Sequence, residues 1–456
     1  MKIFLQHSVR RFSLGFLCLV SFFPGTLLAG TSWDGKAPVE YVLSVTTDRP
    51  DAIYHQGEPV TFNILLEDNK QPATAGEVTW TISKDSVPPI ETGSATLAEG
   101  KAAVTGSLTE PGFLRCEVTF KHDKDKFTAV GAAAIDPLEI KPSLPAPDDF
   151  DAFWAEKKKE LAAVPINAKL TPVPLPPNRT GVELFEYQAD SIGAPSVGYY
   201  GRPAGAKPKS LPAVLFVPGA GVRSANLDAA AGWSKSGMLF IDLNAHGIPD
   251  GKPKEFYAAL DSGELKDYRT RGRESRDTYY FLGVYFRVLR ALDFLTSQPE
   301  WDGKTLILSG VSQGGGLALA GAALDPRVTY MIAFVPGLSD HTGMLVNRIA
   351  GWPKLIPKGP DGKPDPKVME VARYFDNVNF ASRVKVPGHF AVGFLDTTCP
   401  PTCTYAVYNN FAGKKDIVNY PNNGHDLGFQ IWNDMRKVIL AVIAGGPEAK
   451  ATTVAP

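Results

Sequence analysis

The feature that most constrains the fold is a series of short apolar runs, separated by helical stretches, that fills the chain beyond Pro165. Strands buried on both faces of a parallel sheet have this unbroken apolar pattern. Their alternation with helices predicts βαβ units, and therefore an α/β fold with a doubly wound sheet that opens on a strand pair. The expected strands cover residues 182–188, 196–202, 213–217, 238–241, 305–308, 328–335, 389–394 and 416–420. The expected helices include residues 273–296, 315–323 and 431–444.

The preceding region, from about residue 41 to residue 135, has a different pattern in which apolar and polar residues alternate. Clusters of Pro and Gly separate the alternating runs. Short amphipathic strands of this kind predict an immunoglobulin-like β-sandwich, which we place at 34–137. We expect a spacer or packing module, with carbohydrate binding as the alternative. The clearest apolar positions are Val60, Phe62, Ile64, Leu66, Val78, Trp80, Ile82, Leu114, Cys116, Val118 and Phe120.

A Pro-rich linker at 138–150 joins the sandwich to the second domain, which we place at 151–447, and a C-terminal tail follows at 448–456. Proline stiffens such a connection, so we expect the two domains not to be freely tethered. Asp148 or Asp149 is expected to cap a helix that runs through Phe153 and Leu161.

The first 29 residues are typical of an export signal. Basic residues precede a mostly apolar run at 12–23, and the small residue Ala29 offers a cleavage site. The sequence therefore predicts a signal peptide at 1–29 and a periplasmic or secreted protein. Arg10 and Arg11 leave the twin-arginine route open beside general secretion, and a retained N-terminal anchor is the alternative. We expect no membrane span in the mature chain, because no later apolar run is long enough.

The overall charge is nearly balanced, with 47 Lys and Arg against 48 Asp and Glu. A net charge of -1 gives no electrostatic reason to expect a nucleic acid or an anionic membrane as partner. Cys116, Cys399 and Cys403 remain after the signal, which is not a disulfide framework. Cys116 is expected to be a buried thiol. A bridge between Cys399 and Cys403 is geometrically demanding, so we expect free thiols, with the bridge as the alternative.

The strongest motif is Gly-Val-Ser-Gln-Gly at 310–314, with an apolar strand before it and a small-residue helix after it. A sharp strand-to-helix turn of this kind holds a nucleophilic serine at the edge of the sheet in α/β-hydrolases. The pentapeptide alone is common by chance, and the alternative is a Gly-rich turn without chemistry. In its strand and helix context it predicts that Ser312 is a nucleophile and that the sheet is of the α/β-hydrolase kind.

A serine hydroxyl needs a base, and in this fold an acid and then a histidine follow the nucleophile along the chain. His425 lies in a loop between the last expected strand and the last expected helix, where it can reach the carboxyl ends of the strands. It is therefore the predicted base. His341 and His389 are the alternatives, and His389 begins a strand, where a buried histidine is usually structural.

The predicted acid is Asp396, which directly follows the expected strand 389–394 and would hold the imidazole in one tautomer. Asp376 is the competing acid, and Asp426 is expected to cap its loop. The developing oxyanion needs backbone donors. We expect these to be the amide of Gln313, the residue after the nucleophile, and the amide of Ala220 in the Gly-rich loop after an early strand.

At these residues the chain resembles the acetyl xylan esterase / cephalosporin C deacetylase family, carbohydrate esterase family 7. The resemblance covers about residues 147–445. Its motifs are Pro-Asp-Asp-Phe-Asp-Ala-Phe-Trp at 147–154, Tyr-Tyr at 279–280 with Val-Tyr at 284–285 and Arg-Ala-Leu at 290–292, Gly-Val-Ser-Gln-Gly-Gly-Gly at 310–316, Leu-Asp-Pro-Arg-Val at 324–328, Tyr-Phe-Asp at 374–376 and Asp-Thr-Thr-Cys-Pro-Pro at 396–401.

The resemblance implies deacetylation of acetylated sugars and xylo-oligosaccharides, with no metal and no organic cofactor. It assigns Ser312, Asp396 and His425 to a catalytic triad. It also implies closed homo-oligomers, a tendency that the extra sandwich is expected to alter. The chain departs from the family where Pro-Gly-Ala at 218–220 replaces His-Gly-Tyr, Asn-Ala-His at 244–246 replaces Arg-Gly-Gln, and Asp426 replaces a glutamate. The change at 220 removes a tyrosine side chain that the resemblance places near the acyl site.

The expected reaction is therefore a two-step acyl transfer from an acetylated oligo- or polysaccharide. An esterase or peptidase of the same fold with another acyl substrate is one alternative. A carbohydrate-binding protein with an inactive hydrolase domain is the other, and the complete order of serine, acid and histidine disfavours it.

Overall fold

The structure is a computed structural model that describes residues 40–85 and 87–445. The predicted signal peptide at 1–29 and the predicted tail at 448–456 lie outside the described residues. Within the described part of the chain, no helix combines the length and the apolar character needed to cross a membrane.

The N-terminal region is all-β. Its nine strands are linked in the order β1-β3-β7-β6-β5-β8-β9-β2, with β4 paired to β3. They enclose a core that includes Phe62, Leu66, Val78 and Cys116, so Cys116 is the buried thiol that its alternating run predicts. The strands are β1 Tyr41–Thr47, β2 Ile53–Tyr54, β3 Val60–Asp68, β4 Gln71–Pro72, β5 Ala75–Lys84, β6 Glu91–Ala98, β7 Lys101–Gly106, β8 Gly112–His122 and β9 Asp125–Ile135.

The second sheet has the order β10-β11-β12-β14-β13-β15-β16-β17-β18. The pairs from β13 and β14 onward are parallel, and the three pairs formed by β10, β11, β12 and β14 are antiparallel. This confirms the predicted α/β sheet and its opening strand pair. The strands are β10 Lys169–Pro172, β11 Val182–Ala189, β12 Ser196–Pro203, β13 Leu211–Val217, β14 Leu239–Asn244, β15 Trp301–Val311, β16 Tyr330–Phe334, β17 Gly388–Gly393 and β18 Lys415–Tyr420.

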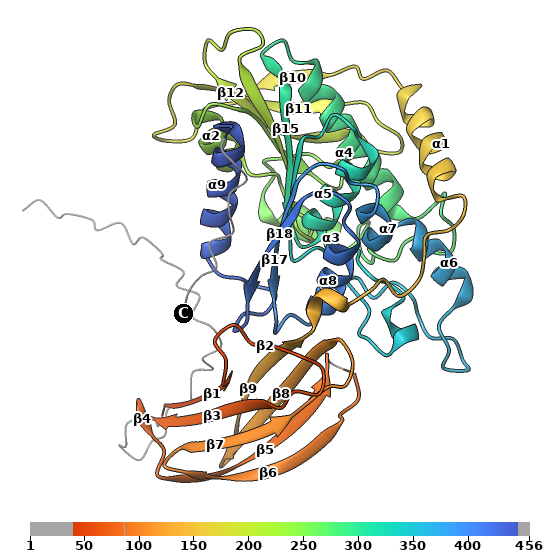
Figure 1. The fold of residues 1–456 in the computed structure, drawn as a ribbon. Coiled ribbons are helices and arrows are strands. Elements are labelled where there is room, and N and C mark those ends of the chain that lie inside the picture. The colour runs from red at the N-terminus through yellow and green to blue at the C-terminus, as the bar shows by residue number, and fades with distance from the viewer. Residues whose placement is uncertain (1–39, 86, 446–456) are drawn as a thin grey trace, which may run out of the picture.

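Helices cover both faces of this sheet (Figure 1). One apolar core joins α2 and α9 to one face, and a second joins α1, α4, α5 and α8 to the other, which is why the strands are apolar on both sides. The helices are α1 Phe150–Ala162, α2 Leu227–Lys235, α3 Lys254–Ser262, α4 Tyr280–Ser297, α5 Gln313–Leu324, α6 Pro366–Tyr374, α7 Asn377–Ala381, α8 Pro401–Asn410 and α9 Gln430–Ile443, with short 3-10 turns η1 Pro137–Glu139 and η2 Gly343–Val346.

Two local expectations need correction. The helix expected from residue 273 begins only at Tyr280, because the preceding segment forms turns and Gly272 has φ +69°. Asp149 does occupy the N-cap of α1, but its side chain makes no capping bond. It accepts hydrogen bonds from Tyr374 and Arg276 instead, which tie the start of α1 to the loop before α4 and to the end of α6.

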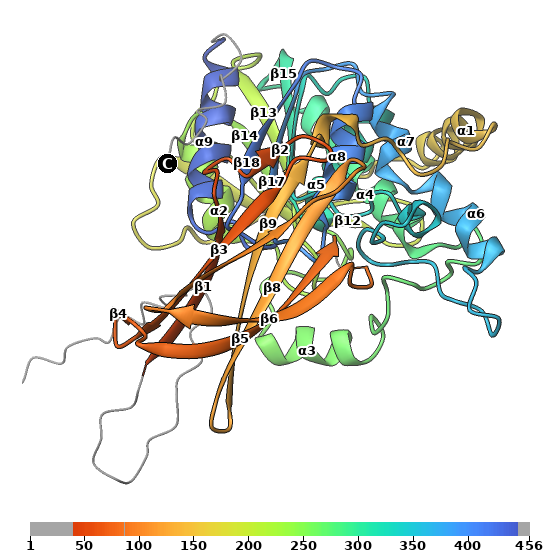
Figure 2. The same ribbon diagram turned by 60° about the horizontal axis from the view of Figure 1, so that its bottom comes forward.

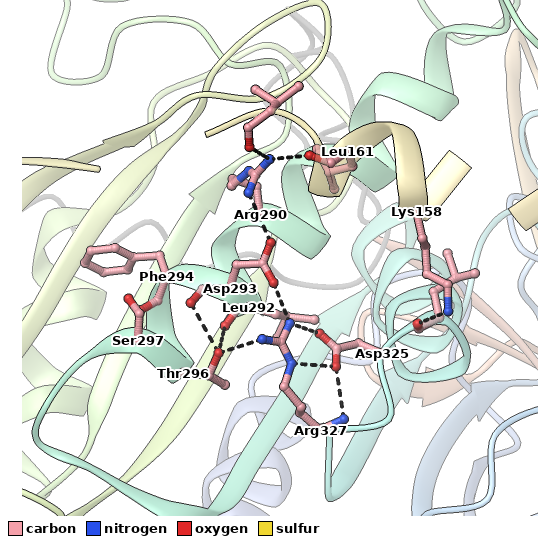
Figure 3. Close-up of polar contacts among 12 residues, drawn as sticks. Lys158, Leu161, Arg290, Leu292, Asp293, Phe294, Thr296, Ser297, Asp325 and Arg327 are labelled. Carbon is pink, nitrogen blue, oxygen red and sulfur yellow. Dashed lines mark hydrogen bonds and ion pairs between the residues drawn. The ribbon is translucent and has the colours of Figure 1, made fainter. Parts of the chain in front are cut away.

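A polar cluster fastens the helices on one face to each other (Figure 3). Arg327 donates to Asp325 and Asp293, which joins the turn after α5 to the end of α4. Arg290 on α4 donates to the carbonyl oxygens of Leu161 and Val164 at the end of α1. This cluster includes Asp325 and Arg327 of the Leu-Asp-Pro-Arg-Val motif and connects the residues after α5 to α4.

Candidate active site

Ser312 lies at the sharp turn between β15 and α5. Its backbone has φ +61° and ψ −124°, a conformation that residues with a Cβ rarely adopt and that marks a strained position. The flanking glycines permit this turn, because a Cβ on Gly310 would collide with the backbone of Gly314, and one on Gly314 with the carbonyl of Val217. The amide of Ser312 donates to the carbonyl oxygen of Phe334 at 2.9 Å, which fixes the turn against β16.

The structure brings Ser312, His425 and Asp396 together in one hydrogen-bonded chain. His425 Nε2 lies 2.9 Å from Ser312 Oγ, and His425 Nδ1 lies 2.7 Å from Asp396 Oδ2. A carboxylate only accepts, so Nδ1 carries the proton and Nε2 of the neutral ring is free to accept the serine proton. This is the arrangement of an activated serine nucleophile.

Asp396 is held in place by its own loop, directly after β17. Its Oδ1 accepts the amides of Thr398 and Cys399 at 2.8 Å and 2.9 Å, and its side chain is fully buried. These two hydrogen bonds from backbone amides occupy Oδ1. The other oxygen, Oδ2, is therefore left to accept from His425. The Asp-Thr-Thr-Cys sequence thus forms the turn that aims the carboxylate.

The competing residues take other positions. His389 pairs through Nδ1 with Asp416 Oδ2 at 2.5 Å, at the opposite end of β17. His341 is fully buried, and burial lowers the pKa of its imidazole to about 3. Asp376 accepts the amides of Asp340, His341 and Val378, and burial raises its pKa to about 7. Asp426 accepts the amide of Gly428 within its loop, as expected.

The loop that carries Ala220 follows β13, and three side chains fix its backbone. Arg223 donates to the carbonyl oxygens of Gly219 and Ala220 at 2.9 Å and 2.7 Å. Tyr268 Oη accepts the amide of Gly221 at 3.3 Å and donates to the side-chain oxygen of Gln313 at 2.9 Å. The Tyr268 hydroxyl therefore connects the loop to the residue that follows Ser312.

His246 is the third of these side chains. Its Nε2 lies 3.1 Å from the carbonyl oxygen of Gly221, and its Nδ1 lies 2.7 Å from the hydroxyl of Tyr280. Burial lowers the pKa of His246 to about 4, so the ring is neutral, donates through Nε2 and accepts through Nδ1. Sequence reasoning noted position 246 only as a departure from the family, and it missed Arg223 and Tyr268. The position of Asn-Ala-His directly after a buried strand was the signal available.

A pocket of about 500 Å³ opens beside Ser312, between α2, α9 and the ends of β13 and β14. Trp432 is 46% exposed, and its ring centroid lies 6.0 Å from that of Phe216. The pocket also contains Asp242, whose Oδ1 accepts the amide of Asn226 and whose pKa burial raises to about 7. Its remaining lining residues are Pro218, Gly219, Arg223, Ser224, Ala229, Trp233, Phe240, Val311 and Met435.

The thiol of Cys399 lies next to the triad. One ligand atom each from Cys399, Asp396 and His425 lie within 4.8 Å of one another, which is close enough for a metal ion. However, the carboxylate and the imidazole are already bonded to each other, and burial raises the pKa of the thiol well above its usual value. Cys399 and Cys403 are both free and buried, as expected. The cluster therefore fits a hydrogen-bonded triad better than a metal centre.

Comparisons with known proteins identify the family of the chain. Residues 135–439 match the model of the acetyl xylan esterase (AXE1) family. The chain is 32% identical over 394 residues to the acetyl esterase Axe7A of Xylanibacter ruminicola, with 85% of this chain and 87% of that protein covered.

Two solved structures are similar to the second domain. The acetyl xylan esterase from Paenibacillus sp. R4 has 29% identity and a TM-score of 0.58, covering 68% of this chain and 98% of that one. Acetyl xylan esterase 1 from Thermoanaerobacterium sp. JW/SL YS485 has 23% identity and a TM-score of 0.56, covering 67% and 97%, and shows the shared fold. Because the family model spans residues 135–439 and the Xylanibacter esterase is 32% identical over most of both chains, this chain belongs to the acetyl xylan esterase family and is a carboxylic ester hydrolase.

Proposed function

We propose that this esterase removes O-acetyl groups from acetylated oligo- or polysaccharides through an acetyl-enzyme intermediate on Ser312. The observation that carries the proposal is the unbroken chain of hydrogen bonds from Asp396 through His425 to Ser312. The family gives the reaction class, carbohydrate deacetylation, and the geometry gives the residues that would perform it.

In the first step, His425 Nε2 takes the proton of Ser312 Oγ while the oxygen attacks the acetyl carbonyl carbon. A bond forms between Oγ and that carbon, and the carbonyl π electrons move to the oxygen. When this tetrahedral species collapses, the bond to the sugar oxygen breaks, and His425 gives its proton to the departing sugar hydroxyl. Asp396 stabilises the imidazolium that exists between these two transfers.

In the second step, water releases acetate. His425 takes a proton from the water as the water oxygen attacks the acetyl-serine carbonyl carbon, and it returns the proton to Ser312 Oγ as that bond breaks. The enzyme therefore ends each cycle in its starting protonation state, which is consistent with a site that requires no cofactor.

The oxyanion of both steps requires donors that are oriented in advance. Gln313 opens α5, so its amide is one of the first-turn amides that have no intrahelical acceptor. The amide of Ala220 is the proposed second donor, in the loop that Arg223, Tyr268 and His246 fix. Here the Tyr268 bridge to Gln313 supports the proposal, because it links the two parts of the oxyanion site.

The pocket beside Ser312 supports a carbohydrate as the leaving group. An acetyl group is far smaller than a pocket of about 500 Å³, so with an acetyl ester the remaining space is available to the sugar. Exposed Trp432 offers an aromatic face, and Asp242 and Arg223 are polar residues of the same lining. Apolar walls with a few polar groups are typical of small-molecule sites, and a sugar ring presents both kinds of surface.

The decisive experiment is acetate release by the wild-type protein and by Ser312→Ala, with p-nitrophenyl acetate and acetylated xylan as substrates. We expect the variant to lose activity by about 10⁴-fold or more, because no nucleophile remains. A fluorophosphonate probe should label wild-type protein at Ser312 and leave the variant unlabelled. Undiminished turnover by Ser312→Ala would refute the proposed mechanism.

An acyl series on one leaving group shows which side of the ester fills the pocket. If the pocket holds the sugar, p-nitrophenyl acetate should be cleaved much faster than the butyrate and octanoate esters. Equal or higher rates with the longer esters would instead assign the pocket to the acyl group and favour the longer-acyl esterase.

A further inference from the structure

The N-terminal sandwich packs against α8 of the second domain (Figures 1 and 2), and this helix follows the loop that contains Asp396. We call residues 388–410, which include β17, the Asp396 loop and α8, the acid segment. We call Asp85, Phe113 and Arg115 the docking face of the sandwich. Along β8, Leu114, Cys116, Val118 and Phe120 point into the sandwich core, so Phe113 and Arg115 point out of it.

Phe113 is the apolar centre of this contact. Its side chain is fully buried and belongs to the core of the second domain rather than to the core of the sandwich. Its ring packs edge-on against Phe394 at 5.1 Å between centroids, and it also contacts Tyr405 at 5.8 Å. Phe394 lies two residues before Asp396, and Tyr405 lies in α8 on the other side of the loop. The side chain of Phe113 thus contacts residues on both sides of the Asp396 loop.

Asp85 adds a buried hydrogen bond at the start of α8. Its carboxylate accepts the hydroxyl of Thr402, in the first turn of that helix, and the side chain is 3% exposed. The amide of Asp85 donates to the carbonyl oxygen of Phe113 at 2.7 Å, so the polar and apolar contacts are part of one unit. Burial raises the pKa of Asp85 to about 6.

The segment after the sandwich holds the opposite end of α8. Asn409 donates to the carbonyl oxygens of Pro137 and Ile140 at 2.9 Å and 2.7 Å. The helix that follows the acid loop is therefore fixed at its first turn, its middle and its last turn by residues from the N-terminal part of the chain.

Arg115 brings a positive charge to the same face. Burial lowers the pKa of its guanidinium, and the negative charges of Asp85, Glu117 and Asp396 partly offset that effect. The acid of the proposed triad is thus within electrostatic range of a sandwich side chain.

From these contacts we infer that the docking face of the sandwich is a positioning element of the esterase site, which holds the acid segment so that Asp396 orients His425. The inference rests on the proposed function, because it assigns the sandwich a role in the proposed triad. Among the described residues, none from the sandwich lines the pocket beside Ser312. A loss of the docking contact should therefore lower kcat and leave KM nearly unchanged, since it misplaces the acid without touching the substrate.

The experiment compares Phe113→Ala with Phe120→Ala in the full chain. Both variants remove the same side chain from β8, but Phe120 packs inside the sandwich against Tyr41 and Phe127. We expect both to lower the unfolding temperature. At a temperature below both transitions, Phe113→Ala should lower kcat for p-nitrophenyl acetate by about 10- to 100-fold, because small displacements of catalytic groups have effects of that size. Phe120→Ala should keep the wild-type kcat, and KM should stay within about twofold in both.

Graded variants keep the test informative if Phe113→Ala does not fold. Phe113→Leu should retain more of kcat than the alanine variant. Asp85→Asn keeps an acceptor for Thr402 and should retain more of kcat than Asp85→Ala. Equal kcat values for Phe113→Ala and Phe120→Ala, or for Asp85→Ala and wild type, would show that the sandwich does not position the acid. Those outcomes differ from failure of the proposed function, in which Ser312→Ala itself stays active.

Discussion

Two histidine–carboxylate pairs lie at opposite ends of the same two parallel strands. At the carboxyl end, His425 and Asp396 follow β18 and β17, with Nδ1 2.7 Å from the carboxylate. At the amino end, His389 and Asp416 are the second residues of those strands, with Nδ1 2.5 Å from the carboxylate. The pairing chemistry is the same, yet only the first pair lies beside a serine hydroxyl. A histidine–carboxylate pair alone therefore does not identify a candidate catalytic site. The end of the strands at which the pair lies is what distinguishes the two.

The sheet geometry explains the difference. In an α/β sheet the loops after the strands form the crevice, whereas the amino ends are covered by the connections that enter them. His389 is 2% exposed and its ring packs edge-on against Phe334, so the imidazole is enclosed by the protein. Four residues of strand, roughly 13 Å at 3.3 Å per residue, separate His389 from the carboxyl end of β17.

The largest expected contrast comes from changing the two histidines in parallel. His425→Gln should lower kcat by about 10⁴-fold or more, because no base remains for Ser312. His389→Gln should keep kcat within about threefold and lower the free energy of unfolding by about 1–3 kcal/mol, the usual cost of disturbing a buried hydrogen bond. Steady-state kinetics and urea unfolding measure both effects. A similar loss of kcat in both variants would break the comparison.

The two carboxylates give a finer contrast. Asp396→Asn preserves the shape of the side chain but favours the wrong imidazole tautomer, so kcat should fall by about 10³- to 10⁴-fold. Asp416→Asn should leave kcat nearly unchanged. Steady-state kinetics with p-nitrophenyl acetate measure kcat for both variants. Near-wild-type activity of Asp396→Asn would contradict the role proposed for Asp396.

The smallest effect concerns His341. Its imidazole is fully buried, but in the described part of the chain neither ring nitrogen is hydrogen-bonded to a carboxylate. Its folded-state pKa, about 3, is below the ordinary value of 6.5, so the unfolded chain binds a proton between these values and the folded chain does not. The stability contributed by the neutral ring is present above pH 6.5 and is lost as the pH falls, by up to about 1.4 kcal/mol per pH unit. As the pH is lowered from 7.5 to 4.5, the free energy of unfolding of His341→Leu, measured with urea, should therefore rise relative to that of wild type. A constant difference would contradict this reasoning, because contributions of the buried carboxyls cancel between the two proteins.

The sequence predicted the features that depend on local contacts. The turn at Ser312 was predicted correctly because a strand, a tight glycine turn and a helix are all encoded within a few neighbouring residues. Asp396 and His425 were proposed because each follows a short apolar run and because the fold orders acid and histidine after the nucleophile. The late start of α4 was missed, since the turns before it depend on long-range packing rather than on helical periodicity.

By itself, then, the sequence determined the alternation of strands and helices, the nucleophile turn and the order of the candidate triad. The tertiary structure alone supplied three contacts: that of Ser312 with His425, which the sequence already favoured over His389, that of Arg223, Tyr268 and His246 with the Ala220 loop, and that of Phe113 of the sandwich with Phe394 near Asp396. These three outcomes depend on contacts between residues far apart in the chain, which local patterns of hydrophobicity and turn residues do not encode.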